Sequence, residues 1–294
     1  MRALIPLFWP LACLLAGFAP LSSQGVIDAT PPEAWRPLVP ENTLYMDVGG
    51  KTVVMELAPE LAPNTVRNIR TLVREGYFDG LSINRVQDNY VVQWGDPDAE
   101  DPAKQRKQNI PPTLAPEFGR PAAGVAFSPI PGPDGFGEPG FVNGFAATRT
   151  DGAVWATHCY AALGVGRGEA ADSGNGSELY VVIGHAPRHL DRNVTVAGRV
   201  ISGIETLSSL KRGTGAIGFY ETAAERVPIT RIRVGSDMPA AERLPIEIMR
   251  TDSASFRDYV DARAHRMRDG WFTRDAGFID VCNIRVPTRA LARP

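Results

Sequence analysis

Arg85 and Gln93 stand beside apolar side chains in the segment INRVQDNYVVQWGD, residues 83–96. Arg85 and Gln93 carry strong hydrogen-bond donors, whereas their valine neighbours are typical of a core. A cation that leaves water costs several kcal/mol unless a partner compensates it. Arg85 therefore has either a carboxylate partner within the protein or a ligand as its partner. The candidate carboxylates are Asp88, Asp96 and Glu178.

Other residues that could do chemistry have unfavourable spacing. The segment GVGRGE, residues 164–169, has Glu169 where a dinucleotide-binding loop needs its third glycine. Ser177 lacks the Gly-x-Ser-x-Gly surroundings of a nucleophile elbow. The four histidines, His158, His185, His189 and His265, do not have the spacing of zinc ligands. We therefore expect no metal and no cofactor.

The strand that carries Arg85 lies in a chain of many short strands. Two apolar runs, residues 44–48 and 51–57, flank Gly49-Gly50 and predict a β-hairpin. Further strands are expected near residues 81–86, 90–96, 152–166, 177–184, 194–201 and 229–234.

Two helices are expected far apart in the sequence. The first begins at Pro63 and ends at Gly76, and the second covers residues 202–210. The first has one apolar face, made of Val66, Ile69, Leu72 and Val73. No β-α-β alternation is sustained, so a doubly wound sheet is disfavoured. The sequence predicts a mainly β fold, an antiparallel eight-stranded barrel capped by two helices.

Three segments lie outside this barrel pattern. Residues 24–42 are rich in proline and predict an N-terminal arm. Within a main domain of residues 43–237, residues 97–158 predict an irregular insertion. Residues 238–294 predict a C-terminal extension packed on the barrel. That extension should contain a helix from Ser253, its N-cap, to Asp269.

Residues 1–23 predict a signal peptide, with a positive start, an apolar run and a small polar end. The alternative, a membrane anchor, requires about 20 uninterrupted apolar residues. Pro6 and Pro10 interrupt this run. We expect cleavage after Ala19 or Ser23, a periplasmic or secreted protein, and no stable membrane insertion after cleavage.

Composition limits the classes of partner. The chain has 294 residues, of which 44% are hydrophobic and 22% charged, which is typical of a folded globular protein. The formal net charge of −2 gives no overall positive field, so we expect no nucleic-acid partner.

Two cysteines, Cys159 and Cys282, remain once the leader with Cys13 is removed. An even number of cysteines in an exported protein favours a disulfide. The alternative is two separate buried thiols that act as small apolar side chains. The sequence leaves both open.

Three motifs, in order, resemble those of the cyclophilin-type peptidyl-prolyl isomerases. Asn84-Arg85 stands at the family's His-Arg, and YVVQWGD, residues 90–96, stands at Phe-Met-x-Gln-x-Gly-Asp. NGSELYVVI, residues 175–183, is similar to Asn-Gly-Ser-Gln-Phe-Phe-Ile. HLDRNVTVAGRV, residues 189–200, is similar to the family's third motif, Trp-Leu-Asp-Gly-x-His-Val-Val-Phe-Gly-x-Val. The resemblance covers about residues 43–235.

The resemblance implies an isomerase that acts on X–Pro bonds of polypeptide clients, with Arg85 as the catalytic residue. It implies an apolar proline pocket made of Tyr90, Val91, Tyr180 and Leu190. The client backbone would be bound by Gln93 and by Val165, Gly166 and Arg167, and His189 would stand at the pocket edge.

Several positions that bear on the pocket depart from the family pattern. Val91 replaces a methionine, Glu178 the second glutamine, Tyr180 a phenylalanine and Val194 the pocket histidine. Two functions therefore stay open at this point. The chain is either an exported isomerase or a non-catalytic chaperone or scaffold module that binds proline-containing segments on the same barrel.

Overall fold

The computed structural model describes residues 20–150 and 152–291. The leader predicted for residues 1–23 thus lies mostly outside the described residues, as does Cys13. No helix within the described part of the chain is long and apolar enough to span a bilayer.

Eight strands form a closed barrel in the order β11-β12-β5-β4-β14-β2-β3-β13, and each neighbouring pair is antiparallel. The strands are β2 (Thr43–Val48), β3 (Lys51–Leu57), β4 (Ser82–Val86), β5 (Val91–Gly95), β11 (Ala162–Val165), β12 (Leu179–Val182), β13 (Val196–Ser202) and β14 (Val227–Val234). The predicted fold class is confirmed.

The predicted hairpin is β2 and β3. Gly49 and Gly50 both adopt positive φ, at 56° and 74°. A two-residue hairpin turn of this kind requires positive φ at both positions, which glycine adopts without steric cost. This turn sets the register of the two strands, with Val48 opposite Lys51.

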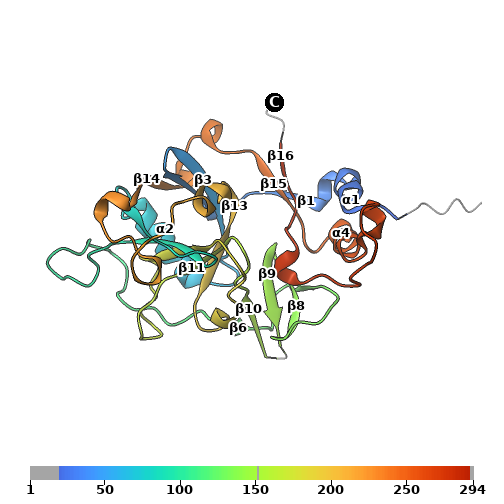
Figure 1. Ribbon diagram of the computed structural model, residues 1–294, viewed down its shortest axis with the longest axis horizontal. Coiled ribbons are helices and arrows are strands. Elements are labelled where there is room, and N and C mark those ends of the chain that lie inside the picture. Colours follow the sequence, from blue (N-terminus) through green and yellow to red (C-terminus); the bar gives the residue numbers. More distant parts are fainter. Residues whose placement is uncertain (1–19, 151, 292–294) are drawn as a thin grey trace, which may run out of the picture.

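Helices α2 (Pro63–Arg74) and α3 (Ile204–Ser208) fill and cover the barrel. The apolar face predicted for α2 is buried, and Gly76 adopts a φ of 68° just after the helix ends. Leu72 and Leu207 join the inward-facing side chains of the strands in one core. Barrel interior and helices therefore form a single apolar unit (Figure 1).

The insertion at residues 97–158 is not irregular throughout, contrary to expectation. Its second half forms a five-stranded antiparallel sheet in the order β6-β10-β9-β8-β7. The strands are β6 (Arg120–Pro121), β7 (Ser128–Pro129), β8 (Glu138–Val142), β9 (Phe145–Arg149) and β10 (Ala153–Ala156). The edge strands β6 and β7 have only two residues and end in proline, so they show no period in the sequence.

The predicted N-terminal arm is ordered and joins the C-terminal extension. Strand β1 (Trp35–Pro37) pairs with β15 (Ile246–Met249), which pairs with β16 (Thr288–Ala290). Helix α1 (Ser23–Ala29) packs against α4 (Ala254–Ala264). Figure 1 shows these elements together on one side of the barrel, so the two ends of the chain form one layer.

The start of the helix in the extension agrees with expectation, and its end does not. Ser253 is the N-cap of α4, as predicted, because its hydroxyl accepts the backbone N–H of Phe256. The helix ends at Ala264, and residues 266–269 form a 3₁₀ turn instead of its last part. Cys282 lies in the 3₁₀ turn Val281–Asn283.

Candidate active site

The predicted site residues surround a cleft of about 310 Å³ on the outer face of the barrel. Ten of the twelve line it: Arg85, Tyr90, Val91, Gln93, Val165, Gly166, Arg167, Tyr180, Leu190 and Val194. The other two, Glu178 and His189, do not line the cleft but contact residues that do. Glu178 binds Gln93, and the ring of His189 stacks with that of Tyr90 at 6.4 Å between centroids.

Strand alternation explains why polar side chains stand in a core-like segment. On β5, Val92 and Trp94 point into the barrel, whereas Val91 and Gln93 face the cleft. Arg85 on β4 is the cross-strand partner of Gln93, and Tyr180 on β12 is its partner on the other side. The register shifts between Ile83 and Arg85. Such a bulge re-aims the side chain that follows it.

Among the residues that the structure describes, the Arg85 guanidinium binds only neutral oxygens. Its Nε donates to the carbonyl of Ile217 at 2.8 Å, its Nη1 to Gln93 Oε1 at 2.9 Å and its Nη2 to Gln87 Oε1. The guanidinium carbon lies 5.6 Å from the Tyr90 ring centroid and 5.5 Å from that of Phe219. Burial lowers the pKa of Arg85, and the negative potential of Tyr90 and Glu178 opposes this effect.

The carboxylates that could have paired with Arg85 have other partners. Asp88 pairs with Arg212 at 2.9 Å, and Asp96 accepts the backbone N–H of Arg106. Glu178 accepts from Gln93. Within residues 20–150 and 152–291, Arg85 forms no ion pair, so the intramolecular salt-bridge interpretation is wrong.

Glu178 fixes the amide of Gln93. Gln93 is 8% exposed, and its Nε2 donates to Glu178 Oε1 at 2.5 Å. An ionised carboxylate only accepts hydrogen bonds, so the amide must turn its nitrogen to Glu178 and its oxygen to Arg85. Arg85, Gln93 and Glu178 thus form a hydrogen-bond network. In it, the amide of Gln93 lies between the guanidinium and the carboxylate.

The Tyr180 hydroxyl is bound beneath the cleft. It lies 2.8 Å from Nε2 of the buried His158, whose Nδ1 lies 2.8 Å from Asp191 Oδ1. Asp191 also accepts from Arg188 Nε at 2.5 Å. Burial raises the pKa of Tyr180 far above its ordinary value. The tyrosine therefore presents an apolar ring to the cleft, much as a phenylalanine would.

Sequence reasoning missed two groups of residues at this site. His158, Asp191 and Arg188 form the network under Tyr180, although His158 had been considered only as a metal ligand. The segment before β14 contributes Ile217 and Phe219, and Phe219 forms a β-bridge with Arg85. The glycines of GTGAIGF were an available signal. A Cβ on Gly218 would lie 2.6 Å from the Cα of Gln87, so only glycine allows this close approach.

No group of three or more His, Cys, Asp or Glu side chains in the described part of the chain could hold a metal ion. The cleft instead offers an apolar pocket, a cation and backbone edges. That set of groups can bind and polarise a neutral substrate.

Comparison with known proteins gives the family. Residues 43–234 match the family model described as cyclophilin type peptidyl-prolyl cis-trans isomerase/CLD. A probable peptidyl-prolyl cis-trans isomerase of Brucella suis biovar 1 (strain 1330) is 28% identical over 178 residues, 60% of this chain and 75% of that protein. Peptidyl-prolyl cis-trans isomerase B of Bacillus subtilis (strain 168) is 28% identical over 165 residues, 56% of this chain and 86% of that protein.

Among solved structures, cyclophilin AquaCyp293 from Hirschia baltica has a similar fold. Its TM-score is 0.68 at 24% identity, and the match covers 94% of this chain and all of that one. The likeness in fold thus extends beyond the residues of the family match. The motifs, the barrel and the family match agree: the chain belongs to the cyclophilin family of peptidyl-prolyl cis-trans isomerases and is an enzyme.

Proposed function

We propose that Arg85 catalyses rotation about X–Pro bonds in exported polypeptide clients. The observation that carries this proposal is a half-buried guanidinium that lines the cleft beside Tyr90 and Val91 and binds only neutral oxygens. The positive charge of Arg85 is therefore available to a bound substrate.

The chemistry needs no nucleophile. Rotation about a peptide bond has a barrier of about 18–20 kcal/mol because it breaks amide resonance. In the twisted transition state the proline nitrogen is pyramidal and carries a lone pair. A guanidinium N–H that donates to this lone pair stabilises the transition state more than the planar ground state, and this difference is catalysis.

The remaining cleft residues bind and orient the client in this mechanism. The rings of Tyr90 and Tyr180, with Val91 and Leu190, form the proline pocket. Gln93 and the edge at Val165–Arg167 bind the backbone on either side of the proline. Val91 and Val194 are smaller than the residues of the family pattern and leave more room in the cleft.

The leader at residues 1–23 and the disulfide described below support an exported location, periplasmic or secreted. Clients in that compartment are newly translocated polypeptides whose prolines must isomerise before folding is complete.

The test is a protease-coupled isomerisation assay on short X-Pro peptides with wild type, Arg85→Ala and a control, Arg231→Ala. Arg231 pairs with Asp47 on the barrel surface away from the cleft. We expect Arg85→Ala to lower kcat/KM about a hundredfold, the usual effect of removing one transition-state donor. Circular dichroism should show both variants folded. Unchanged activity per folded molecule in Arg85→Ala would refute the assigned role.

A further inference from the structure

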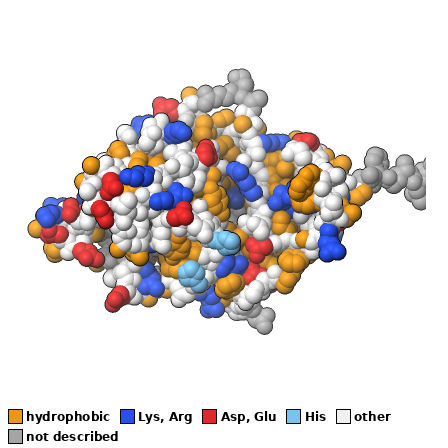
Figure 2. All heavy atoms as spheres, in the orientation of Figure 1, with side chains coloured by type: hydrophobic (Ala, Val, Ile, Leu, Met, Phe, Trp, Pro, Cys, Tyr) orange, Lys and Arg blue, Asp and Glu red, His pale blue; other side chains and the backbone are white. Residues whose placement is uncertain are grey.

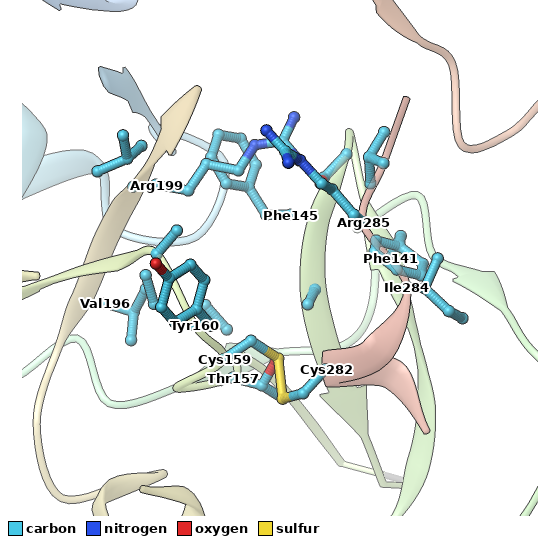
Figure 3. A pocket seen from close by; sticks show the side chains of 18 of the residues that line it. Phe141, Phe145, Thr157, Cys159, Tyr160, Val196, Arg199, Cys282, Ile284 and Arg285 are labelled. Atoms are coloured by element: carbon cyan, nitrogen blue, oxygen red, sulfur yellow. A yellow bond between two sulfur atoms is a disulfide. The ribbon is translucent and has the colours of Figure 1, made fainter. Parts of the chain in front are cut away.

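A second cavity, of about 200 Å³, lies where the barrel meets the two appended layers. We name it the junction cavity. Its walls come from β11 and β13 of the barrel, from the β8–β9 hairpin of the insertion and from residues 281–288 of the C-terminal extension. The Cys159–Cys282 disulfide lies at one end, and Arg199 and Arg285 lie at the other (Figure 3).

The walls of the junction cavity are mostly apolar. They include Phe141, Phe145, Val196, Ile201, Ile284 and Val286. Small side chains, among them Ala146, Ala156 and Ala162, leave the space open. An apolar cavity of about 150 Å³ is large enough to bind benzene. This cavity therefore accommodates an apolar group of about six to eight carbon atoms.

The charged side chains that line the cavity are both arginines. Arg199 and Arg285 line the cavity, and no aspartate or glutamate is among the lining residues. Glu56 binds Arg199 at 3.0 Å and Arg36 at 2.7 Å, so two cations share one carboxylate. Burial lowers the pKa of Arg199, Glu56 opposes this effect and Arg36 adds to it.

Arg285 adds a further positive charge. Its side chain is exposed and forms no ion pair with any residue that the structure describes. Figure 2 shows blue arginine or lysine side chains together with orange apolar ones where the barrel meets the part that carries α1 and α4. An apolar pocket with excess positive charge at its mouth is complementary to an amphiphilic anion.

We propose that the junction cavity binds an apolar acyl or aryl group that ends in a carboxylate. The apolar part lies between Phe141, Phe145 and the disulfide, and the carboxylate lies between the guanidinium groups of Arg199 and Arg285. Either a free acid or the C-terminal residue of a polypeptide has this chemistry.

The junction cavity is separate from the active-site cleft but close to it. Ala162 and Val196 line the junction cavity and pack in one apolar cluster with Val91 and Tyr180, which line the cleft. A test must therefore distinguish binding at the two sites, and Arg85→Ala does so because it changes only the cleft.

Calorimetric titration of the full chain with octanoate tests the proposal. We expect octanoate to bind, whereas acetate lacks the apolar part and octylammonium has the wrong charge. Arg285→Glu should weaken octanoate binding at least tenfold, and Ala146→Leu, which fills the cavity, should abolish it. Arg274→Glu is the matched control because Arg274 is exposed on the same extension and does not line the cavity. Neither Arg274→Glu nor Arg85→Ala should change binding.

A leucine-ending pentapeptide without proline distinguishes the two sources. Binding of its free acid but not of its C-terminal amide, with the same loss in Arg285→Glu, assigns the cavity to polypeptide C-termini. Binding of octanoate alone assigns it to small acids. The proposal is overturned if neither acid binds, if octylammonium binds as tightly as octanoate, or if Arg285→Glu leaves binding unchanged.

Discussion

The buried charged residues below Tyr180 determine whether its hydroxyl is paired, and so whether the cleft is lined by an apolar ring or by a free polar group. Asp191 accepts from the Nδ1 of His158 and from Arg188, which also pairs with Asp134 at 3.0 Å. The Nδ1 of His158 lies 2.8 Å from the Asp191 carboxylate, and its Nε2 lies 2.8 Å from the Tyr180 hydroxyl. A tyrosine can therefore occupy this position without leaving its hydroxyl unpaired beside the cleft.

Asp191→Asn should destabilise the protein in a pH-dependent way. Burial alone would raise the pKa of Asp191, but the hydrogen bonds from His158 and Arg188 hold it below its ordinary value. The folded-state pKa is thus lower than the unfolded one, so the carboxylate stabilises the fold above about pH 4. This contribution is lost as pH falls through the folded-state pKa.

Breaking a buried pair costs about 3–5 kcal/mol. We expect Asp191→Asn to lower the free energy of unfolding by about this amount at pH 7 in urea denaturation. The difference from wild type should shrink below about pH 4. Asp252→Asn is the control, since Asp252 pairs with Arg250 at the surface, where such pairs contribute about 0–1 kcal/mol. Equal losses in the two variants would contradict a structural role for the network.

Local sequence carries most information about residues that lie on regular strands. Arg85, Gln93 and Tyr180 lie on strands whose alternation is visible in the sequence, and their register follows once the barrel closes. His158 and Asp191, or Arg85 and Phe219, meet only through tertiary packing. No local pattern connects residue 85 with residue 219, so these contacts could not be predicted from one sequence.

At the scale of the elements, loops and very short strands are the hardest to predict from the sequence. Residues 97–119 form no strand, but a side chain of this segment forms hydrogen bonds with helix α2. Glu117 accepts the backbone N–H groups of Asn64 and Thr65 at 3.0 and 2.8 Å, which caps the N-terminus of α2. A carboxylate at this end also interacts favourably with the helix dipole. A cap supplied from 52 residues away leaves no local signal.

The disulfide joins the extension to the barrel. The structure contains the bond between Cys159 and Cys282, with their Cα atoms 4.9 Å apart. It closes a loop of 123 residues, for which chain entropy gives about 4–5 kcal/mol. The extension also has packing of its own, since Phe256, Ile248 and Ile284 share a core with Trp35 and Phe141. The bond therefore adds to a layer that is already packed.

Cys282→Ser should lower the free energy of unfolding by about 2–5 kcal/mol under non-reducing conditions. Wild type treated with a reductant should match the variant, which is the internal control. Isomerase activity should stay within about twofold, because neither cysteine lines the active-site cleft. Free thiols that alkylate in denatured, non-reduced wild type would show instead that the bond does not form.

At the scale of the whole molecule, the N-terminal arm and the C-terminal extension pack against each other. Strand β1 lies at the edge of a sheet completed by β15 and β16, and α1 packs on α4 (Figure 1). The isomerase barrel is formed by the chain between them. Composition predicts little core for residues 238–294 alone. It could not show that the two segments combine, because β1 is only three residues long.

This arrangement predicts where the mature chain begins. The expected cleavage sites follow Ala19 or Ser23 in the leader. The hydroxyl of Ser22 accepts the backbone N–H of Gly25 at 3.2 Å and caps α1, whose Val26 is buried. Cleavage after Ser23 would remove this cap, which is worth about 1 kcal/mol. Gly17 and Ala19 provide small residues of the kind that signal cleavage requires.

We therefore expect Pro20 to be the mature N-terminus. Mass spectrometry of protein from its native compartment measures this directly, and a chain that retains Met1 to Ala19 would contradict export with cleavage. Recombinant chains that start at Pro20 and at Gln24 provide the matched comparison. The shorter chain lacks the Ser22 cap and should unfold at a lower urea concentration, by about 1 kcal/mol in unfolding free energy. Its isomerase activity should be unchanged, because α1 contacts α4 and contributes nothing to the cleft.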